Sequence, residues 1–387
     1  MRPPIYLDHN ATAPLLPEVA AAMAECHASG YGNPASQHSA GRRARQRIDE
    51  AVEAIARLLG ANVEGREGDR IIFTSGGTEA NNLAIFGLAE IAPKRVIVSA
   101  IEHPSVAAPA RQLERRGWRV ERIPVSRAGV VELAALDELL AAPARLVSVM
   151  LGNNETGAVQ PAAEIARRCR AAGALTHADV VQAVGKLPID FRALGVDAMT
   201  ISAHKLHGPV GIGALVMRRG VDMRPLLYGG AQQEAVRPGT ESIALIVGFQ
   251  RALDLAVQQR EARAAHLQAL RDRFEQRLLG ACPEIVVHAR GVERLPHTSN
   301  LAFVGADRQA LLIALDLAGV ACSAGSACAS GSAEPSPTLV AMGCPKAEID
   351  ASLRFSLGAA TTAEEIDEAA ERILRCFNQL RLRNNCP

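Results

Sequence analysis

The chain has 387 residues, of which 48% are hydrophobic and 21% charged, and this composition excludes a disordered protein. The 42 basic and 41 acidic residues leave a net charge of +1, which argues against a basic surface that binds nucleic acid. The N-terminus lacks the apolar core of a signal peptide, and no apolar run is long enough to span a bilayer. We therefore expect a cytoplasmic protein of two domains that binds neither nucleic acid nor membrane.

From about residue 40 to residue 255 the pattern alternates between helix and strand. Apolar residues at helical spacing over 40–59 predict a helix that stops at Gly60. Short apolar runs that suit strands buried on both faces follow at 70–73, 95–100, 120–125, 145–151, 175–180, 198–202 and 213–217. Helical stretches between these runs predict a mostly parallel sheet.

The second part of the chain has a different pattern. Residues 241–279 indicate a long, mostly helical connector, followed by strands at 285–289, 298–304 and 353–357 and a helix at 308–318. Thr362 and Glu365 have the spacing of a capping box that opens the last helix. The predicted fold is α/β, with a large domain (15–255) and a smaller α+β domain (1–14 and 256–387).

A glycine turn, Ser75-Gly-Gly-Thr-Glu79, lies directly between a predicted strand and a predicted helix. Free N–H groups at such a helix start attract an anion, and glycine lets a phosphate approach the backbone closely. The motif matches neither the Walker nor the GxGxxG pattern, so an ordinary glycine turn is an equally good interpretation.

Two further predicted strands end in residues that carry chemistry. His177-Ala-Asp179 ends one, and Ser202-Ala-His204-Lys205 ends another. Only four of the basic residues are lysines, and Lys205 is one of them. A desolvated lysine can form a Schiff base, and an aspartate can keep a pyridine nitrogen protonated, so together they favour pyridoxal phosphate (PLP). A surface lysine and a helix-capping aspartate remain the alternative for either residue alone.

Residues 321–336 form a run of small residues that indicates a mobile loop, with Cys328 at its centre. A cysteine in such a loop can be an exposed nucleophile or an inert thiol, and the residues alone favour neither. The other cysteines are predicted to be reduced and buried, and the absence of a CxxC pair leaves no metal site predicted.

Taken together, the motifs resemble those of the PLP-dependent cysteine desulfurases, and specifically the NifS type within the class-V aminotransferase superfamily. The resemblance runs nearly end to end and implies the fold of type I PLP-dependent transferases. It rests on these segments: Tyr6-Leu-Asp-His-Asn-Ala-Thr12, Gly32-Asn-Pro34, Thr74-Ser-Gly-Gly-Thr-Glu79, Glu102-His-Pro104, Asn153-Asn-Glu-Thr-Gly157, Asp179-Val-Val-Gln-Ala-Val-Gly-Lys186, His204-Lys-Leu-His-Gly-Pro209, Arg237-Pro-Gly-Thr240, Gly325-Ser-Ala-Cys328 and Leu353-Arg-Phe-Ser356.

The resemblance implies a role for each matching residue around the cofactor. Lys205 would carry the Schiff base with PLP, and Asp179 would pair with the pyridine nitrogen. His103 would stack on the ring and move protons, and Gln182 would contact the ring hydroxyl. The residues that would hold the phosphate are Gly77, Thr78, Ser202 and His204.

The resemblance also implies a reaction and its partners. Asn154 and Arg354 would hold the carboxylate of L-cysteine, and Cys328 would take the sulfur as a persulfide and leave alanine. Thr240 would reach the phosphate in the other subunit of a homodimer. The sulfur would pass to an acceptor protein for iron–sulfur cluster assembly, with nitrogenase clusters as one destination.

Other functions stay open from the sequence. A selenocysteine lyase or another class-V PLP enzyme is the first alternative, and a catalytically silent thiol sensor or structural protein is the second. Cys322 is interpreted as a small buried residue that ends the helix before the loop, rather than as a second persulfide site. Val210 and Ala324 depart from the family pattern, but neither removes a catalytic group.

Overall fold

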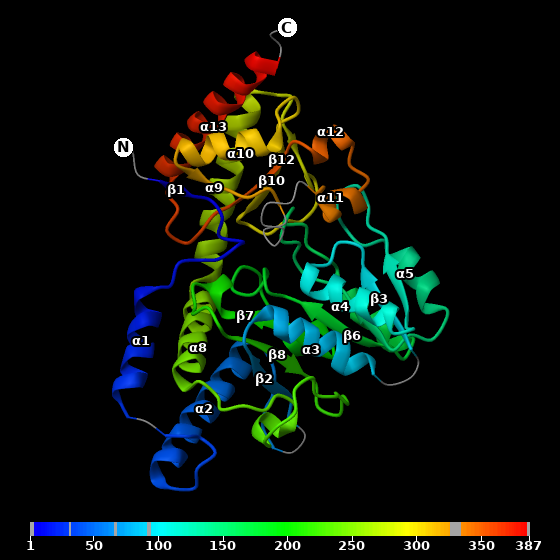
Figure 1. Ribbon diagram of the computed structural model, residues 1–387, viewed down its shortest axis with the longest axis vertical. Coiled ribbons are helices and arrows are strands. Elements are labelled where there is room, and N and C mark those ends of the chain that lie inside the picture. Colours follow the sequence, from blue (N-terminus) through cyan, green and yellow to red (C-terminus); the bar gives the residue numbers. More distant parts are fainter. Residues whose placement is uncertain (1–3, 31, 66–67, 91–93, 326–333, 385–387) are drawn as a thin grey trace.

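The computed structural model describes residues 4–30, 32–65, 68–90, 94–325 and 334–384. A seven-stranded sheet forms the centre of its larger part (Figure 1). β8 is antiparallel to both of its neighbours, and all other pairs are parallel, as predicted. The strand order is β2 (Arg70–Thr74), β8 (Gly213–Met217), β7 (Ala198–Ser202), β6 (Leu175–Asp179), β5 (Leu146–Ser148), β3 (Arg95–Ser99) and β4 (Arg119–Ile123).

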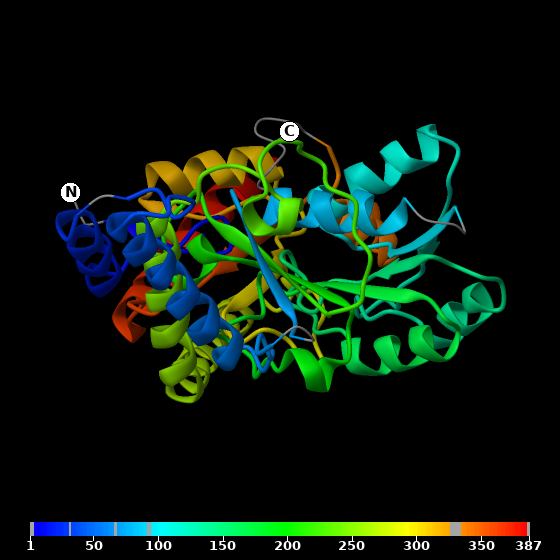
Figure 2. The same ribbon diagram turned by 90° about the horizontal axis from the view of Figure 1, so that it is seen from below.

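Helices cover both faces of this sheet, as Figures 1 and 2 show. Alternate strand residues point to opposite faces, so Ile71 and Phe73 pack toward α2 and α8 while Ile72 packs toward α3 and α4. The helices of this part are α1 (Pro17–Ala28), α2 (Ser39–Leu58), α3 (Gly77–Ala89), α4 (Pro104–Arg115), α5 (Leu133–Leu140), α6 (Ala162–Ala171), α7 (Phe191–Leu194) and α8 (Ile243–Gln258), with short 3-10 helices η1 (Ala203–Leu206) and η2 (Gln232–Ala235).

A smaller antiparallel sheet lies in the other part of the molecule, in the order β12 (Ser352–Ser356), β10 (Thr298–Ala302) and β9 (Val286–Val287). Strands β1 (Ile5–Tyr6) and β11 (Val320–Ala321) pair in parallel beside it. Ile5 and Leu7 therefore share one apolar core with residues from the C-terminal third of the chain. The helices here are α9 (Arg260–Ala281), α10 (Arg308–Leu317), α11 (Pro337–Ala341), α12 (Lys346–Ile349) and α13 (Ala363–Asn384).

The predicted connector consists of two consecutive helices, α8 and α9, which meet at Gln259.

The predicted capping box at the start of α13 is confirmed. The N–H of Thr362 donates to Oε2 of Glu365 at 2.9 Å, and the N–H of Glu365 donates to Oγ1 of Thr362 at 3.2 Å. None of the helices in the described ranges combines the length and apolarity needed to cross a membrane.

The prediction for Cys322 is wrong in two respects, because the residue is partly buried rather than buried and does not end a helix. The residue follows strand β11 and not the helix before it, because α10 ends at Leu317 and the chain turns into a short strand at Val320. Burial raises the pKa of its thiol, so the thiol form dominates at neutral pH, and Cys322 packs against the apolar core that contains Ile5 and Leu7.

Candidate active site

The two strand ends that the sequence singled out lie side by side. β6 and β7 are parallel neighbours, and Asp179 is in register with Thr200 near the end of β7. Lys205 follows β7 on η1. Parallel strands bring their carboxyl ends to one sheet edge, and a cavity of about 330 Å³ opens there. Its lining includes ten of the predicted site residues: Gly77, Thr78, His103, Asn154, Asp179, Gln182, Ser202, His204, Lys205 and, from the small sheet, Arg354.

The glycine turn forms one wall of this cavity. Gly76 has φ 154°, a value that favours glycine, and Gly77 and Thr78 begin α3. A Cβ on Gly77 would lie only 3.1 Å from Cγ2 of Val181 and 3.5 Å from Cβ of Ser202. The buried Oγ of Ser202 has no hydrogen-bond partner among the described residues. The turn and this hydroxyl together make a compact site for an anion.

Asp179 is fixed by a residue that sequence reasoning missed. Asn81 on α3 donates from Nδ2 to Oδ2 of Asp179 at 2.7 Å, and the N–H of Val181 donates to Oδ1 at 2.9 Å. Nδ2 of Asn81 also donates to Oγ of Ser105 at 2.8 Å. The aspartate thus has a fixed orientation at the cavity wall. The 98-residue separation from Asn81 left no local signal for this contact.

His103 caps the start of α4 and faces the same cavity. The N–H of Ser105 donates to its Nδ1 at 3.1 Å, so in the neutral ring Nε2 carries the proton. Burial lowers the pKa of His103, which keeps the ring neutral at pH 7. A neutral ring that carries its proton on Nε2 can donate and accept that proton during a reaction.

The N-terminal segment closes the cavity near Lys205. Nζ of Lys205 donates to the carbonyl oxygens of Asn10 and Ala11, the second at 2.6 Å. Nε2 of Gln182 also donates to the carbonyl of Asn10, at 3.1 Å, whereas the buried Oε1 of Gln182 has no partner among the described residues. An acceptor that still lacks a donor is available to a ligand hydroxyl.

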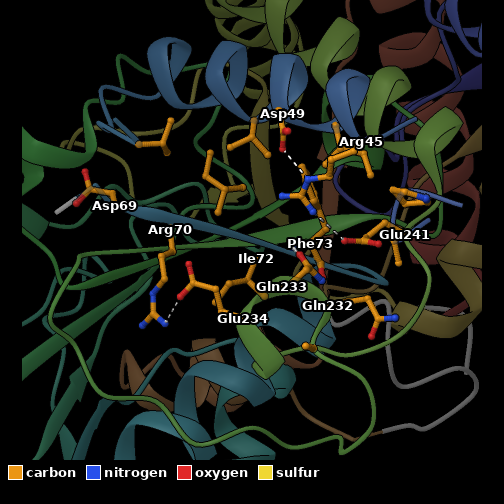
Figure 3. A pocket seen from close by; sticks show the side chains of 17 residues that line it. Arg45, Asp49, Asp69, Arg70, Ile72, Phe73, Gln232, Gln233, Glu234 and Glu241 are labelled. Carbon is orange, nitrogen blue, oxygen red and sulfur yellow. Dashed lines mark hydrogen bonds and ion pairs between the residues drawn. The ribbon is translucent and has the colours of Figure 1, made fainter. Parts of the chain in front are cut away.

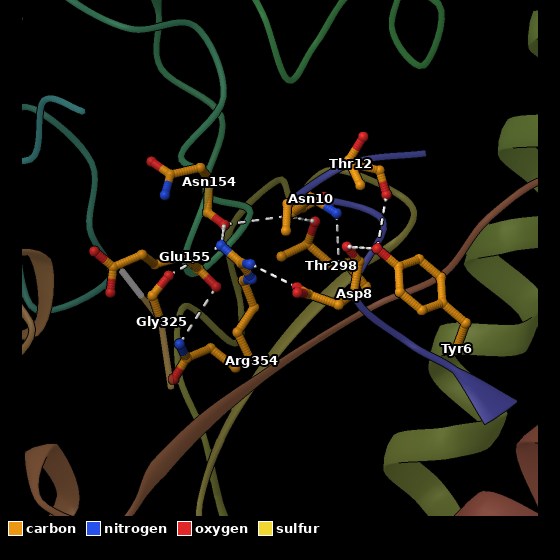
Figure 4. A network of polar contacts seen from close by, with 12 residues as sticks. Tyr6, Asp8, Asn10, Thr12, Asn154, Glu155, Thr298, Gly325 and Arg354 are labelled. Atoms are coloured by element: carbon orange, nitrogen blue, oxygen red, sulfur yellow. Dashed lines mark hydrogen bonds and ion pairs between the residues drawn. The ribbon is translucent and has the colours of Figure 1, made fainter. Parts of the chain in front are cut away.

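Arg354, which is 1% exposed, lies at the centre of a polar network (Figure 4) and lines the same cavity as Lys205. Its Nη2 donates to Oδ1 of Asp8 at 2.7 Å, and its Nη1 donates to the carbonyls of Gly325 at 2.9 Å and Asn154 at 3.2 Å. The buried Nε has no partner within the described ranges. The guanidinium is therefore held in place while one N–H group remains available for an anionic ligand.

Residues on both sides of the segment that contains Cys328 lie close to the carboxylate of Glu155. Ser336 and Thr338 donate to its carboxylate at 2.5 and 3.0 Å, and a Cβ on Gly325 would lie 2.8 Å from its Oε2. Burial raises the pKa of Glu155. Cys328 itself lies outside the described residues. The chain enters the segment that contains Cys328 at Gly325, whose carbonyl accepts from Arg354, and leaves it toward Ser336, which donates to Glu155.

A second lysine, Lys186, contacts the backbone of Lys205. The sequence did not predict this contact. Nζ of Lys186 donates to the carbonyl oxygen of Lys205 at 3.0 Å, and burial lowers its pKa to about 7. Lys186 lines a separate small cavity with His9 and His297. It does not line the cavity of about 330 Å³ at the strand ends. Only Lys205 of these two lysines reaches the space beside Asp179.

Thr240 does not line the cavity and is exposed in the single chain. A second, larger cavity of about 630 Å³ lies close to it, between α2, β2 and the segment 231–241 (Figure 3). The charges in this second cavity pair with one another, as Arg45 does with Asp49 at 2.9 Å and Arg70 with Glu234 at 3.4 Å. This cavity lacks the lysine, histidine and glycine turn of the first.

Glu102, next to His103, gives a prediction on stability. It is buried, accepts from Ser99 Oγ at 2.6 Å and from the N–H of Met150 at 2.7 Å, and burial raises its pKa to about 8. Because the pKa of Glu102 is higher in the folded state than in the unfolded state, the folded protein holds the proton more tightly. The stability that this gives is fully present below about pH 4.5 and is lost as pH rises through 8. Wild type should lose on the order of 5 kcal/mol of unfolding free energy across that range, and Glu102→Gln should not show this loss.

Urea unfolding of both proteins between pH 5 and pH 9 tests this expectation. As pH rises, the free energy of unfolding of wild type should fall relative to that of Glu102→Gln. Glu50→Gln, a change on the exposed face of α2, is the control and should leave the profile unchanged. Parallel profiles for wild type and Glu102→Gln would show that Glu102 is ionised at neutral pH.

The match to a family model covers residues 5–369, and the family is the class-V aminotransferases. The chain belongs to this family, whose members depend on PLP. A cysteine desulfurase of Trichormus azollae is 42% identical over 97% of this chain and 94% of its own length. The cysteine desulfurase NifS of Azotobacter vinelandii is 39% identical over 97% and 93%.

Solved structures agree with this assignment. The NifS-like protein from Rickettsia africae superposes with a TM-score of 0.88 at 34% identity, over 97% of this chain and 99% of that one. The predicted α/β fold and the predicted membership of the PLP-dependent cysteine desulfurases are therefore confirmed.

Proposed function

We propose that this chain converts L-cysteine to L-alanine and holds the released sulfur as a persulfide on Cys328. One observation carries the proposal: Lys205, Asp179 and the glycine turn line one cavity with Arg354, and Arg354 donates to Gly325, where the segment that contains Cys328 begins.

The residues around the cavity fit PLP. The unpaired Oγ of Ser202 and the start of α3 would hold the phosphate, with Thr78 and His204 at its sides. Asp179, fixed by Asn81, would accept from the protonated pyridine nitrogen, and the unpaired Oε1 of Gln182 would accept from the ring hydroxyl. When bound, PLP supplies the electron sink for bonds that break at the substrate's α- and β-carbons.

Arg354 and Asn154 would bind the carboxylate of the substrate. The free Nε–H of Arg354 is a charged donor in a buried site, and such hydrogen bonds contribute roughly 1.5–3 kcal/mol. Asp8 and two backbone carbonyls keep the guanidinium in one orientation, so little side-chain entropy is lost on binding.

Lys205 and His103 would move the protons. Lys205 carries the amine that takes the proton from the α-carbon, and its two carbonyl contacts hold it on the cavity side. His103, neutral and held through Nδ1, would hold or release a proton at Nε2 above the ring.

Cys328 would make the sulfur transfer. Its thiolate attacks the sulfur of the substrate, the S–S bond forms as the C–S bond breaks, and the electron pair of that bond stays with the carbon. That carbon then takes a proton and becomes the methyl group of alanine. The persulfide would next pass to an acceptor protein for iron–sulfur clusters, with nitrogenase clusters as one candidate destination.

We infer a homodimer in which Thr240 reaches the phosphate of the partner subunit. Leu227 is 50% and Tyr228 86% exposed, and the neighbouring Gly229 lies against Pro238 in the segment that carries Thr240. A subunit interface would cover these side chains. We further propose that the chain divides into a large domain (15–255) and a small domain (1–14 and 256–387). We also propose a cytoplasmic location.

Purified protein loaded with PLP tests the function. L-cysteine should change the visible absorbance of the protein and give alanine. Turnover of L-selenocysteine but not of L-cysteine would favour a selenocysteine lyase. A colourless protein without turnover would favour the silent, structural alternative.

A further inference from the structure

Three side chains with metal-ligating atoms meet far from the active site, where α12 and the loop before it approach the small sheet (Figure 1). Nδ1 of His288 lies 3.8 Å from Sγ of Cys344 and 3.8 Å from Oε2 of Glu348. All three ligand atoms lie within 4.8 Å of one another. His288 follows β9, Cys344 precedes α12 and Glu348 lies within it.

The hydrogen bonds of His288 prepare it as a ligand. Oγ of Ser352 donates its proton to the carbonyl of Glu348 at 2.6 Å, so this oxygen can only accept from Nε2 of His288, which lies at 3.0 Å. The neutral ring therefore carries its proton on Nε2 and turns the lone pair of Nδ1 toward Cys344 and Glu348. A second hydrogen bond of this kind is what fixes a metal-binding histidine in its tautomer and orientation.

The three side chains are largely buried, and the side chain of Glu348 is 16% exposed. His288 is 3% and Cys344 8% exposed, whereas the side chain of Arg127 is 49% exposed. Arg127 donates from Nη2 to the same Oε2 of Glu348 at 2.5 Å, so a cation already neutralises this carboxylate. A long, half-exposed side chain can rotate into solvent and leave that oxygen to another cation.

We propose that His288, Cys344 and Glu348 form a binding site for Zn²⁺. Zinc bonds of about 2.0–2.3 Å place tetrahedral ligand atoms about 3.3–3.6 Å apart. The two distances of 3.8 Å from Nδ1 of His288 therefore require a movement of only a few tenths of an ångström, and Sγ and Oε2, which lie within 4.8 Å of each other, approach by at most about 1.2 Å. Arg127 also lies against the thiol of Cys344, so binding displaces Arg127 from both Glu348 and Cys344. The proton of the Cys344 thiol passes to solvent, and water fills the fourth position. Nitrogen, sulfur and carboxylate ligands together suit zinc better than magnesium or calcium.

Co²⁺ added to the PLP-loaded protein, measured as a difference spectrum, tests the thiolate ligand. We expect a thiolate-to-cobalt absorption band that zinc removes by competition. Cys344→Ser should abolish the band and weaken zinc binding at least tenfold, and Ser352→Ala should weaken zinc binding by about tenfold while keeping the band. Arg127→Gln should tighten zinc binding several-fold.

Cys376→Ser is the matched control, because Cys376 is also 8% exposed but lies in α13 beside Ala314. It should leave the band and the affinity unchanged. His288→Gln, which should lose the rise in Tm that zinc gives to wild type, is the second variant if Cys344→Ser does not fold. An absent cobalt band in wild type, or an undiminished band in Cys344→Ser, would overturn the proposal.

Discussion

Lys205→Ala is expected to abolish alanine formation from L-cysteine, by a factor of at least about 10²–10⁴, and to remove the colour of the bound cofactor. Lys205 is the lysine beside Asp179 in the cavity, and Nζ is held there by the carbonyls of Asn10 and Ala11. Alanine at this position supplies neither the Schiff-base amine nor the proton acceptor. The other buried lysine, Lys186, donates toward Lys205 from outside the cavity and should not replace it.

The measurement is an alanine assay on PLP-loaded protein together with a visible spectrum. Lys94→Ala is the matched control, since Lys94 is exposed and packs over Trp118 far from the cavity. Its turnover should equal that of wild type. Normal turnover in Lys205→Ala would exclude Lys205 as the catalytic amine.

Cys328→Ser is expected to reduce alanine formation almost to zero while the protein keeps its colour and still responds to L-cysteine. The hydroxyl of serine is far less nucleophilic at neutral pH than a thiolate, whereas the residues that bind cofactor and substrate are unchanged. A retained spectral response would separate lost chemistry from lost folding or binding.

Stopped-flow absorbance with L-cysteine, followed by alanine analysis, makes this comparison. Cys282→Ser is a suitable control, because burial raises the pKa of that thiol to about 11 and leaves it unreactive. If Cys328→Ser turns over like wild type, another group must accept the sulfur.

The strands and the strand-end chemistry could be predicted because their signals are local. Apolar runs end at Asp179 and Ser202, and parallel pairing of β6 and β7 brings these ends to one edge. The supporting contacts could not be predicted, because they join residues far apart in the chain. Asn81 reaches Asp179, and Asp8 holds Arg354 across 346 residues.

The local sequence also could not predict the pKa values and contacts of groups whose environment depends on packing. Lys186 lies in what looks like an ordinary turn, yet burial lowers its pKa to about 7. His288 and Cys344 are 56 residues apart and match no metal-binding spacing, so only the folded chain brings them together. The two-residue strand β11 before Cys322 is too short to leave a pattern, so the sequence wrongly predicts a helix end there.

The most direct test of the proposed function is to count alanine and bound sulfur in a single turnover. Wild-type protein loaded with PLP is mixed with one equivalent of L-cysteine and no acceptor, and the tryptic peptides are mapped by mass spectrometry. We predict one alanine for each persulfide, with the added sulfur on the peptide that contains Cys328. Absence of alanine, or alanine with the sulfur on another cysteine alone, would contradict the account.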